Sequence, residues 1–280
     1  MANKAKPAGK KPDFASFAGL LMAVGGILLG QRLEGGVPNQ IVRGSAALIV
    51  LGGTIGAVLL SIPLRTLIAA AGRVKDIFLE PVLDAAAMIE EIIGYATKAR
   101  KSGIVSLEAE AAEIIDPFLR KALTLAVDGT DLQEIRKMME LEITVAEQRT
   151  DAAAKVYESA GGYSPTIGII GAVIGLIMVM GNLDNIEKVG EGIASAFVAT
   201  IYGVGFANIL CLPAATKIKA RAHGRTELNE LILEGVVGIV EGLNPKLIRA
   251  KLEAYSTPKV VKGKVAVPAP EQTDAVTAKG

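Results

Sequence analysis

Four stretches of the chain are apolar and contain no charged side chain. They cover residues 14–30, 44–63, 163–183 and 193–215. Each is about 20 residues long, the length that an α-helix needs to cross the hydrocarbon core of a bilayer. An amphipathic surface helix would carry a charged residue in nearly every turn. The pattern therefore predicts an all-α, polytopic membrane protein with four transmembrane helices.

The alternative is four buried core helices of a soluble protein, but the remaining sequence contains too few polar residues to cover them. Half of the 280 residues are apolar (51%) and the mean hydropathy is +0.43. The net charge of +1 gives no general attraction for nucleic acid, so we expect no nucleic-acid partner. One cysteine and one histidine exclude an internal disulfide and a Cys/His metal site. No metal and no cofactor is expected.

Lysine and arginine define an orientation. They are concentrated before residue 14 and around residues 65–75, 149–155 and 217–225, whereas the two short loops within the predicted hairpins carry only Arg32, Arg43 and Lys188. The positive-inside rule then places both termini and residues 64–162 in the cytoplasm. No small-x-small cleavage site follows the first stretch before Arg32, so it is interpreted as an uncleaved span.

The segments outside the spans are predicted to form a helical cytoplasmic domain. An apolar face repeats at helical spacing through residues 82–96, and Ser102-Gly103 marks its end. A second helix is expected from Ser106 to the Asp128-Gly129 turn. Thr130 and Gln133 resemble a capping box that opens a third helix through about residue 158. Further helices are expected at residues 227–240 and 245–255.

The predicted organisation therefore has six parts. They are a tail (1–13), a hairpin of two spans (14–63), a helical domain (64–162), a second hairpin (163–215), C-terminal helices (216–255) and a second tail (256–280). Both tails are expected to be disordered, because they lack the apolar residues that a core requires.

Small residues recur at helical spacing in the last two spans. Gly168, Gly171 and Gly175 form one ridge, and Ala196, Thr200, Gly203 and Ala207 form another. Such ridges let helix backbones approach closely in lipid.

No phosphate-binding loop, acid pair or Ser/His/Asp constellation is present in the sequence, so an enzyme is not expected. The spans also lack the buried Asp, Glu or His that a proton relay requires. The chain could instead form one wall of an ion path whose titratable group comes from a partner helix. Thr200 is the main polar candidate for that wall, and the alternative is a bond to a carbonyl of its own helix.

Several motifs carry a resemblance to a known family. Residues 163–176 (YSPTIGIIGAVIGL) resemble the third span of the MotA/PomA flagellar stator subunits, within the MotA/TolQ/ExbB proton channel superfamily. Residues 190–213, with ATIYG at 199–203, are similar to the fourth span. ARKSG at 99–103 followed by SLE at 106–108 resembles the rotor-facing motif, and GLNP at 242–245 is similar to a C-terminal signature.

The resemblance implies roles for residues in the spans. Pro165 and Pro213 match two prolines linked to conformational change, although Pro165 would also suit a helix start and Pro213 would kink its helix. Thr200 matches a threonine near the partner's ion-carrying aspartate. Ala172 matches a position where sodium-driven members tend to carry threonine. Alanine offers no oxygen ligand, which favours H⁺ over Na⁺ as the transported ion.

Arg100 and Glu108 match the charged pair that meets the rotor in this family, and Lys101 is a weaker candidate. Their places at the end of one predicted helix and the start of the next also complement helix dipoles, worth about 0.3–1 kcal/mol each.

The resemblance also implies the location in the bacterial inner membrane, the partners and the function. These are a MotB-like, single-span, peptidoglycan-binding subunit that carries the ion-binding aspartate, and a FliG-like rotor protein at the cytoplasmic face. The chain would form a homo-oligomer, a pentamer around a partner dimer, and couple ion flow to torque on the flagellar rotor. The alternatives are an ExbB/TolQ-like energiser of an envelope protein, which would usually have three spans and an outside N-terminus, or a non-conducting membrane scaffold.

Overall fold

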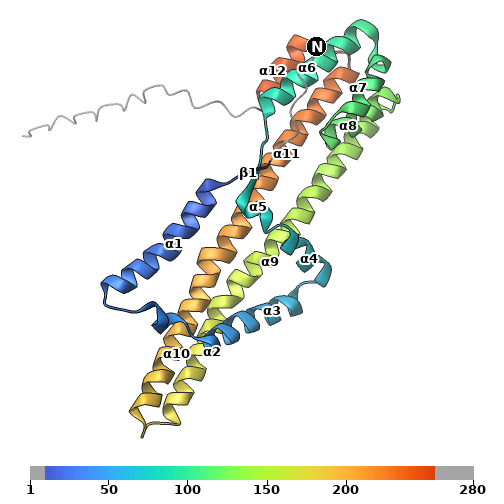
Figure 1. The fold of residues 1–280 in the computed structure, drawn as a ribbon. Coiled ribbons are helices and arrows are strands. Elements are labelled where there is room, and N and C mark those ends of the chain that lie inside the picture. The colour runs from blue at the N-terminus through green and yellow to red at the C-terminus, as the bar shows by residue number, and fades with distance from the viewer. Residues whose placement is uncertain (1–9, 256–280) are drawn as a thin grey trace, which may run out of the picture.

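The computed structural model describes residues 10–255, and its architecture is almost entirely helical. Two long antiparallel columns form its axis (Figure 1). One column is α9 (Leu132–Met180). The other runs without a break through α10 (Ile186–Gly205), the π-helical turn η4 (Phe206–Cys211) and α11 (Leu212–Val240). The predicted all-α fold is confirmed.

The continuity of both columns differs from the prediction. The sequence predicted a helix that ends near residue 158 and a separate span after it. In the structure these two are one helix, α9, so Pro165 lies inside a helix and not at a helix start. Likewise, α11 continues through the predicted break before residue 227. Neighbouring helices can satisfy the backbone group that a proline frees, which is why such residues are tolerated inside membrane helices.

The first two spans flank the columns. The first is α1 (Phe14–Leu33), and the second comprises α2 (Gly44–Ala47), the π-helical turn η2 (Leu48–Gly52) and α3 (Gly53–Ser61). A short 3₁₀ turn, η1 (Pro38–Ile41), lies between them. With the two columns they give four helical segments long and apolar enough to cross a membrane, as the sequence predicts. No residue of α1 is buried, so this helix stands apart from the columns (Figure 1).

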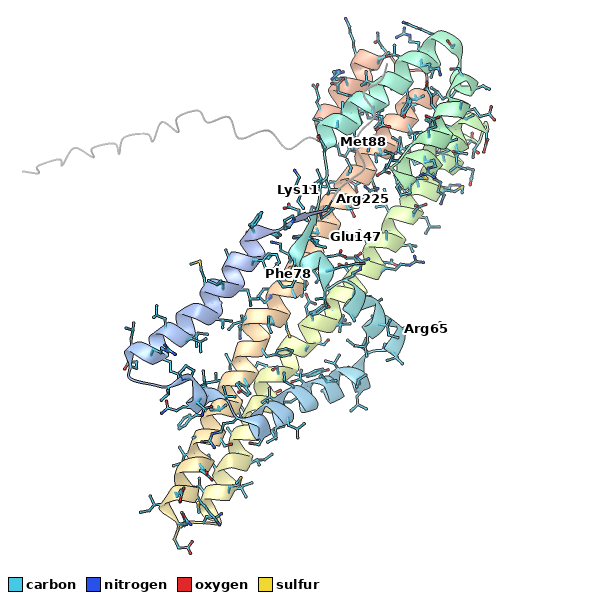
Figure 2. The ribbon with its side chains drawn as sticks, viewed as in Figure 1. Lys11, Arg65, Phe78, Met88, Glu147 and Arg225 are labelled. Atoms are coloured by element: carbon cyan, nitrogen blue, oxygen red, sulfur yellow. The ribbon has the colours of Figure 1, made fainter. Side chains whose placement is uncertain are left out.

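A two-stranded antiparallel sheet ties the N-terminal segment to the connection after the second span. Following α4 (Leu64–Gly72) and α5 (Lys75–Phe78), β2 (Leu79–Pro81) pairs with β1 (Lys10–Pro12), with Lys11 opposite Glu80. Lys11 and Phe78 mark this junction in Figure 2. The prediction of a disordered tail was wrong for Lys10–Pro12, because pairing with a distant strand leaves no local signal in three residues.

The remaining helices form a compact domain, called here the head, around the ends of both columns. They are α6 (Ala85–Ser102), the 3₁₀ turn η3 (Ile104–Leu107), α7 (Glu108–Glu113), α8 (Pro117–Val127) and α12 (Pro245–Glu253). The head holds the largest apolar core of the described chain. Its fully buried large side chains include Ile92, Leu107, Leu119, Leu123, Ile135, Met139, Leu231, Ile232, Ile248 and Leu252.

Helix caps explain two local corrections in the head. Asp131, not Thr130, caps α9, because its carboxylate accepts from the Gln133 N–H at 2.9 Å. The expected single helix after Ser106 is divided at residues 114–116, where Asp116 caps α8 through the N–H groups of Phe118 and Leu119. A carboxylate at the N-cap contributes about 1 kcal/mol, enough to fix where a helix begins.

Candidate functional site

The contact between α9 and α10 is made by backbone on backbone. A Cβ atom added to Gly203 would lie 2.7 Å from the Ser164 carbonyl oxygen, and one added to Gly168 would lie 3.0 Å from the Ala199 oxygen. At Gly175 the neighbour is Ala196, at 2.8–2.9 Å. The two predicted ridges therefore meet, and only hydrogen fits at the glycine positions.

Thr200 on α10 and Ala172 on α9 are each next in sequence to a residue of this contact. Gly171 packs against Ala199, which Ala172 and Thr200 respectively follow, and both Ala172 and Thr200 are half-buried. The Thr200 hydroxyl donates to the Ala196 carbonyl 3.3 Å away, within its own helix. The alternative considered for Thr200 from the sequence is thus the arrangement observed, and a hydroxyl held this way keeps its lone pairs available.

The two prolines lie in different backbone surroundings, Pro165 inside the continuous helix α9 and Pro213 near the π-helical turn η4. Pro165 has no N–H to give to the carbonyl four residues back, at Gly161. Pro213 is the second residue after η4, and the intervening Leu212 N–H donates to the Ala207 carbonyl, five residues back. A proline at this position needs no donor while the hydrogen-bond register returns from five residues to four. The π-helical turn η4, called the wide turn below, and Pro213 therefore form one structural feature.

Tyr202 joins the columns to the loop between the first two spans, a role that the sequence did not reveal. Its hydroxyl donates to the Ile41 carbonyl at 2.7 Å and accepts from the Arg43 N–H at 3.2 Å. The Tyr202 side chain is half-buried, and both hydrogen bonds of its hydroxyl go to backbone groups. The loop is thereby fixed on α10 two residues beyond Thr200.

Arg100, Lys101 and Glu108 are exposed. They lie where α6 ends and α7 begins, in the head. Arg100 and Lys101 lie in the last turn of α6, and Glu108 opens α7 after a turn that Gly103 makes with a φ of +80°. Between residues 10 and 255 none of the three forms an ion pair, whereas Lys98 and Glu110 pair at 2.8 Å across the same turn. Their charges are therefore available to another molecule.

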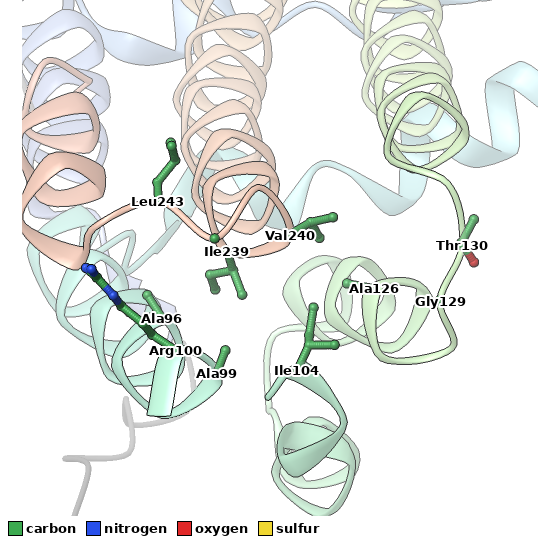
Figure 3. A pocket seen from close by; sticks show the side chains of 11 residues that line it. Ala96, Ala99, Arg100, Ile104, Ala126, Gly129, Thr130, Ile239, Val240 and Leu243 are labelled. Carbon is green, nitrogen blue, oxygen red and sulfur yellow. The ribbon is translucent and has the colours of Figure 1, made fainter. Parts of the chain in front are cut away.

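Arg100 also borders a cleft of about 380 Å³. In Figure 3 its side chain extends past Ala96 toward the turn that carries Leu243. The cleft is lined mainly by small and aliphatic residues of α6, α8, α11 and the turns between helices, among them Ala99, Ile104 and Val240.

An ionic cluster at the base of α1 was missed because Asp13 was assigned to a disordered tail. Its carboxylate caps α1 and pairs with Lys217 and with Arg221 (2.6 Å), and the Asp13 side chain is 8% exposed. Arg221 also donates to the Leu79 carbonyl at 2.7 Å. The hydrogen bond from Lys217 holds the pKa of Asp13 well below its usual range. We call Asp13, Lys217 and Arg221 the clasp, since they join α1 and β2 to α11.

The described features define a polytopic membrane protein whose uncharged apolar spans contain no Asp, Glu, His, Lys or Arg. The profile of the MotA/TolQ/ExbB proton channel family matches residues 110–231. Motility protein A of Helicobacter pylori is 35% identical over 246 residues, covering 88% of this chain and 96% of that protein. Chemotaxis protein PomA of Vibrio alginolyticus is 29% identical over 243 residues, covering 87% and 95%.

Solved structures agree in fold. The C. jejuni MotAB structure matches with a TM-score of 0.82 at 31% identity, covering 93% of this chain and 100% of that chain. The flagellar MotAB stator complex of Bacillus subtilis matches with a TM-score of 0.81 at 34% identity, covering 87% and 96%. The chain belongs to the motility protein A family of flagellar stator subunits, in the bacterial inner membrane. The four spans and these relatives favour this branch over an ExbB/TolQ-like energiser.

Proposed function

We propose that this chain is the proton-conducting subunit of a flagellar stator and that it works with a MotB-like partner. The observation that carries the proposal is the interface of α9 and α10, which is tightly packed and uncharged, with half-buried Thr200 and Ala172 next in sequence to its contact residues. Such a wall cannot relay protons alone, so the carboxylate must come from the partner's single span. Both solved relatives are named MotAB, and the Bacillus subtilis one is named a flagellar MotAB stator complex, which supports a second subunit. In a pentamer around a partner dimer, each of the five copies would contribute one such wall.

The proposed cycle begins when a proton neutralises the partner's carboxylate. Loss of that charge changes the packing that α9 and α10 favour around it. Because α9 is continuous from the interface into the head, movement near Pro165 displaces the head as well. The head then acts on a FliG-like rotor protein through Arg100 and Glu108, with Lys101 as a weaker contact.

Both termini and the head are proposed to be cytoplasmic, as the distribution of lysine and arginine favours. The test is a reporter that is active only in the periplasm, fused to the N-terminus. Activity of this reporter would contradict the proposed orientation and favour the ExbB/TolQ-like alternative.

The ion assignment predicts that rotation is independent of sodium. Replacing Na⁺ by K⁺ at constant pH and membrane potential should leave the speed of tethered cells unchanged, because Ala172 supplies no oxygen ligand for a dehydrated Na⁺. A protonophore should stop rotation. A rotation speed that rises with the Na⁺ concentration at constant pH would contradict the assignment of H⁺. The absence of ion flux when the chain is coexpressed with any single-span partner would favour the non-conducting scaffold.

The rotor contact predicts a large effect of charge reversal. Arg100→Glu with Glu108→Lys should lower torque at least severalfold while the stator still assembles, because both side chains are exposed and form no ion pair within the described chain. Torque would be measured from bead rotation, with assembly followed by a fluorescent tag. Lys246→Glu, at an exposed position on α12, is the matched control and should leave torque unchanged. Unchanged torque in the double variant would refute the contact.

A further inference from the structure

Ser164 is a buried polar residue that neither the ion path nor the rotor contact uses. It directly precedes Pro165 in α9 and its side chain is fully inaccessible to solvent (0% exposed). Its hydroxyl donates across the interface to the Gly203 carbonyl at 3.0 Å. Gly203 lies three residues before η4, so this bond joins the proline of one column to the wide turn of the other.

The Ser164 hydroxyl has a second possible acceptor in its own helix. Pro165 deprives the Gly161 carbonyl of its normal donor, and a helical serine can reach carbonyls three or four residues back. Gly161 is three residues before Ser164. A hydroxyl has one proton, so it can donate to Gly203 or to Gly161 but not to both.

Release of Gly203 would not leave that carbonyl without a partner. The Phe206 N–H also donates to it, as well as to the Tyr202 carbonyl. The Asn208 side-chain amide similarly donates to the adjacent Val204 carbonyl at 2.9 Å. The backbone at the start of η4 thus stays satisfied whether or not Ser164 is bound, which removes the usual penalty for breaking a buried hydrogen bond.

We propose that Ser164 is a positioning residue that switches its hydroxyl between Gly203 and Gly161 as α9 bends at Pro165. The proposal rests on the stator function given above. Bonded to Gly203, Ser164 holds α9 and α10 in the close register that sets the spacing of Thr200 and Ala172. Bonded to Gly161, it satisfies the carbonyl that Pro165 frees and lets the columns separate. The Ser164 hydroxyl keeps one hydrogen bond in each state, so the exchange of acceptor itself costs little free energy and can occur in every cycle.

The test compares Ser164→Ala, Ser164→Cys and wild type in the assembled stator, with its partner subunit, in motile cells. We expect Ser164→Ala to assemble and to keep its stall torque, while speed near zero load falls about two- to tenfold, the range given by loss of one net hydrogen bond. Cysteine is a weaker hydrogen-bond donor of similar volume. The speed of the Ser164→Cys variant should therefore lie between those of wild type and Ser164→Ala. Thr166→Val is the control, because the Thr166 hydroxyl is exposed and donates only to Tyr163 in its own helix.

A merely structural role gives a different pattern. If speed falls only in proportion to the number of assembled stators, or if cysteine matches wild type while alanine is slow, the switch is refuted. Wild-type speed in both variants also refutes it. If Ser164→Ala fails to assemble, the cysteine variant decides, since slow rotation at normal stall torque supports the switch and any other result rejects it. Absence of rotation in wild type would instead refute the proposed function.

Discussion

Gly203→Val is expected to destabilise the α9–α10 interface by about 3 kcal/mol and to abolish motility. The added Cβ would lie 2.7 Å from the Ser164 carbonyl oxygen and 3.0 Å from the Gly168 Cα. Both obstacles are backbone atoms, so no side-chain rotation relieves them and the helices must move apart. The measurements are thermal unfolding of the purified complex and swimming in soft agar.

Gly162→Val provides the matched comparison for Gly203→Val. Gly162 lies in α9 near the same level, and nothing lies within 4 Å of the Cβ it would gain. We expect assembly and swimming to stay near wild type. If both variants lose stability equally, helix propensity and not close packing explains the glycines.

Asp13→Ala is expected to cost about 3 kcal/mol of stability, because it leaves two cations facing each other with no counter-charge. The Arg221 side chain is only 12% exposed and cannot turn freely into water. The substitution also removes the cap of α1, since the Asp13 carboxylate accepts from the Ala15 and Ser16 N–H groups. Because α1 has no buried residue to hold it, we expect its base to detach from β2 and α11. Limited proteolysis and thermal unfolding would detect this.

Asp131→Ala separates the charge effect from the capping effect. Asp131 also caps a helix but is exposed and forms no ion pair within residues 10–255, so its loss should cost only about 1 kcal/mol.

The stabilisation by the clasp also depends on pH. The pKa of Asp13 is lowered in the folded protein, so its stabilisation is complete above about pH 4 and is lost as pH falls further. The stability gap between wild type and Asp13→Ala should therefore narrow below pH 4, and a constant gap would contradict the clasp.

The four spans could be predicted from sequence because the bilayer imposes a local rule. Every backbone group must be satisfied within the hydrocarbon core, so an uncharged apolar run of sufficient length has to be helical. The contact of the two small-residue ridges follows from the same reasoning, since the spacing of Gly168 and Gly203 within each helix is visible in the sequence. The end of α6 was also predictable, because Gly103 adopts a positive φ that favours glycine.

The continuity of the columns could not be predicted, because it depends on neighbours. A proline in a helical pattern normally ends a helix, yet at Pro165 the buried interface with α10 keeps α9 intact. The boundary at Thr130 was wrong for a simpler reason. Threonine and aspartate are both good caps, and nothing local decides between adjacent candidates.

The clasp and the Tyr202 contacts were missed because their partners are distant in sequence. Asp13 and Arg221 are 208 residues apart, and Tyr202 and Ile41 are 161 apart. One signal was available at Asp13, since an aspartate directly before an apolar helix is a typical cap. The roles of Thr200, Ala172, Pro165, Pro213, Arg100, Lys101 and Glu108 stay predictions.

If α9 bends at Pro165, as proposed, its uninterrupted course makes the segment between residues 132 and 165 a rigid arm. From Pro165 to Leu132 the helix rises about 50 Å at roughly 1.5 Å per residue. A change of about 10° in the bend, half of what is usually counted as a sharp kink, would sweep the far end through about 9 Å. Sub-ångström rearrangements beside the ion would thus be amplified into a displacement about as wide as a helix. A flexible break in α9 between residues 132 and 165 would absorb that displacement.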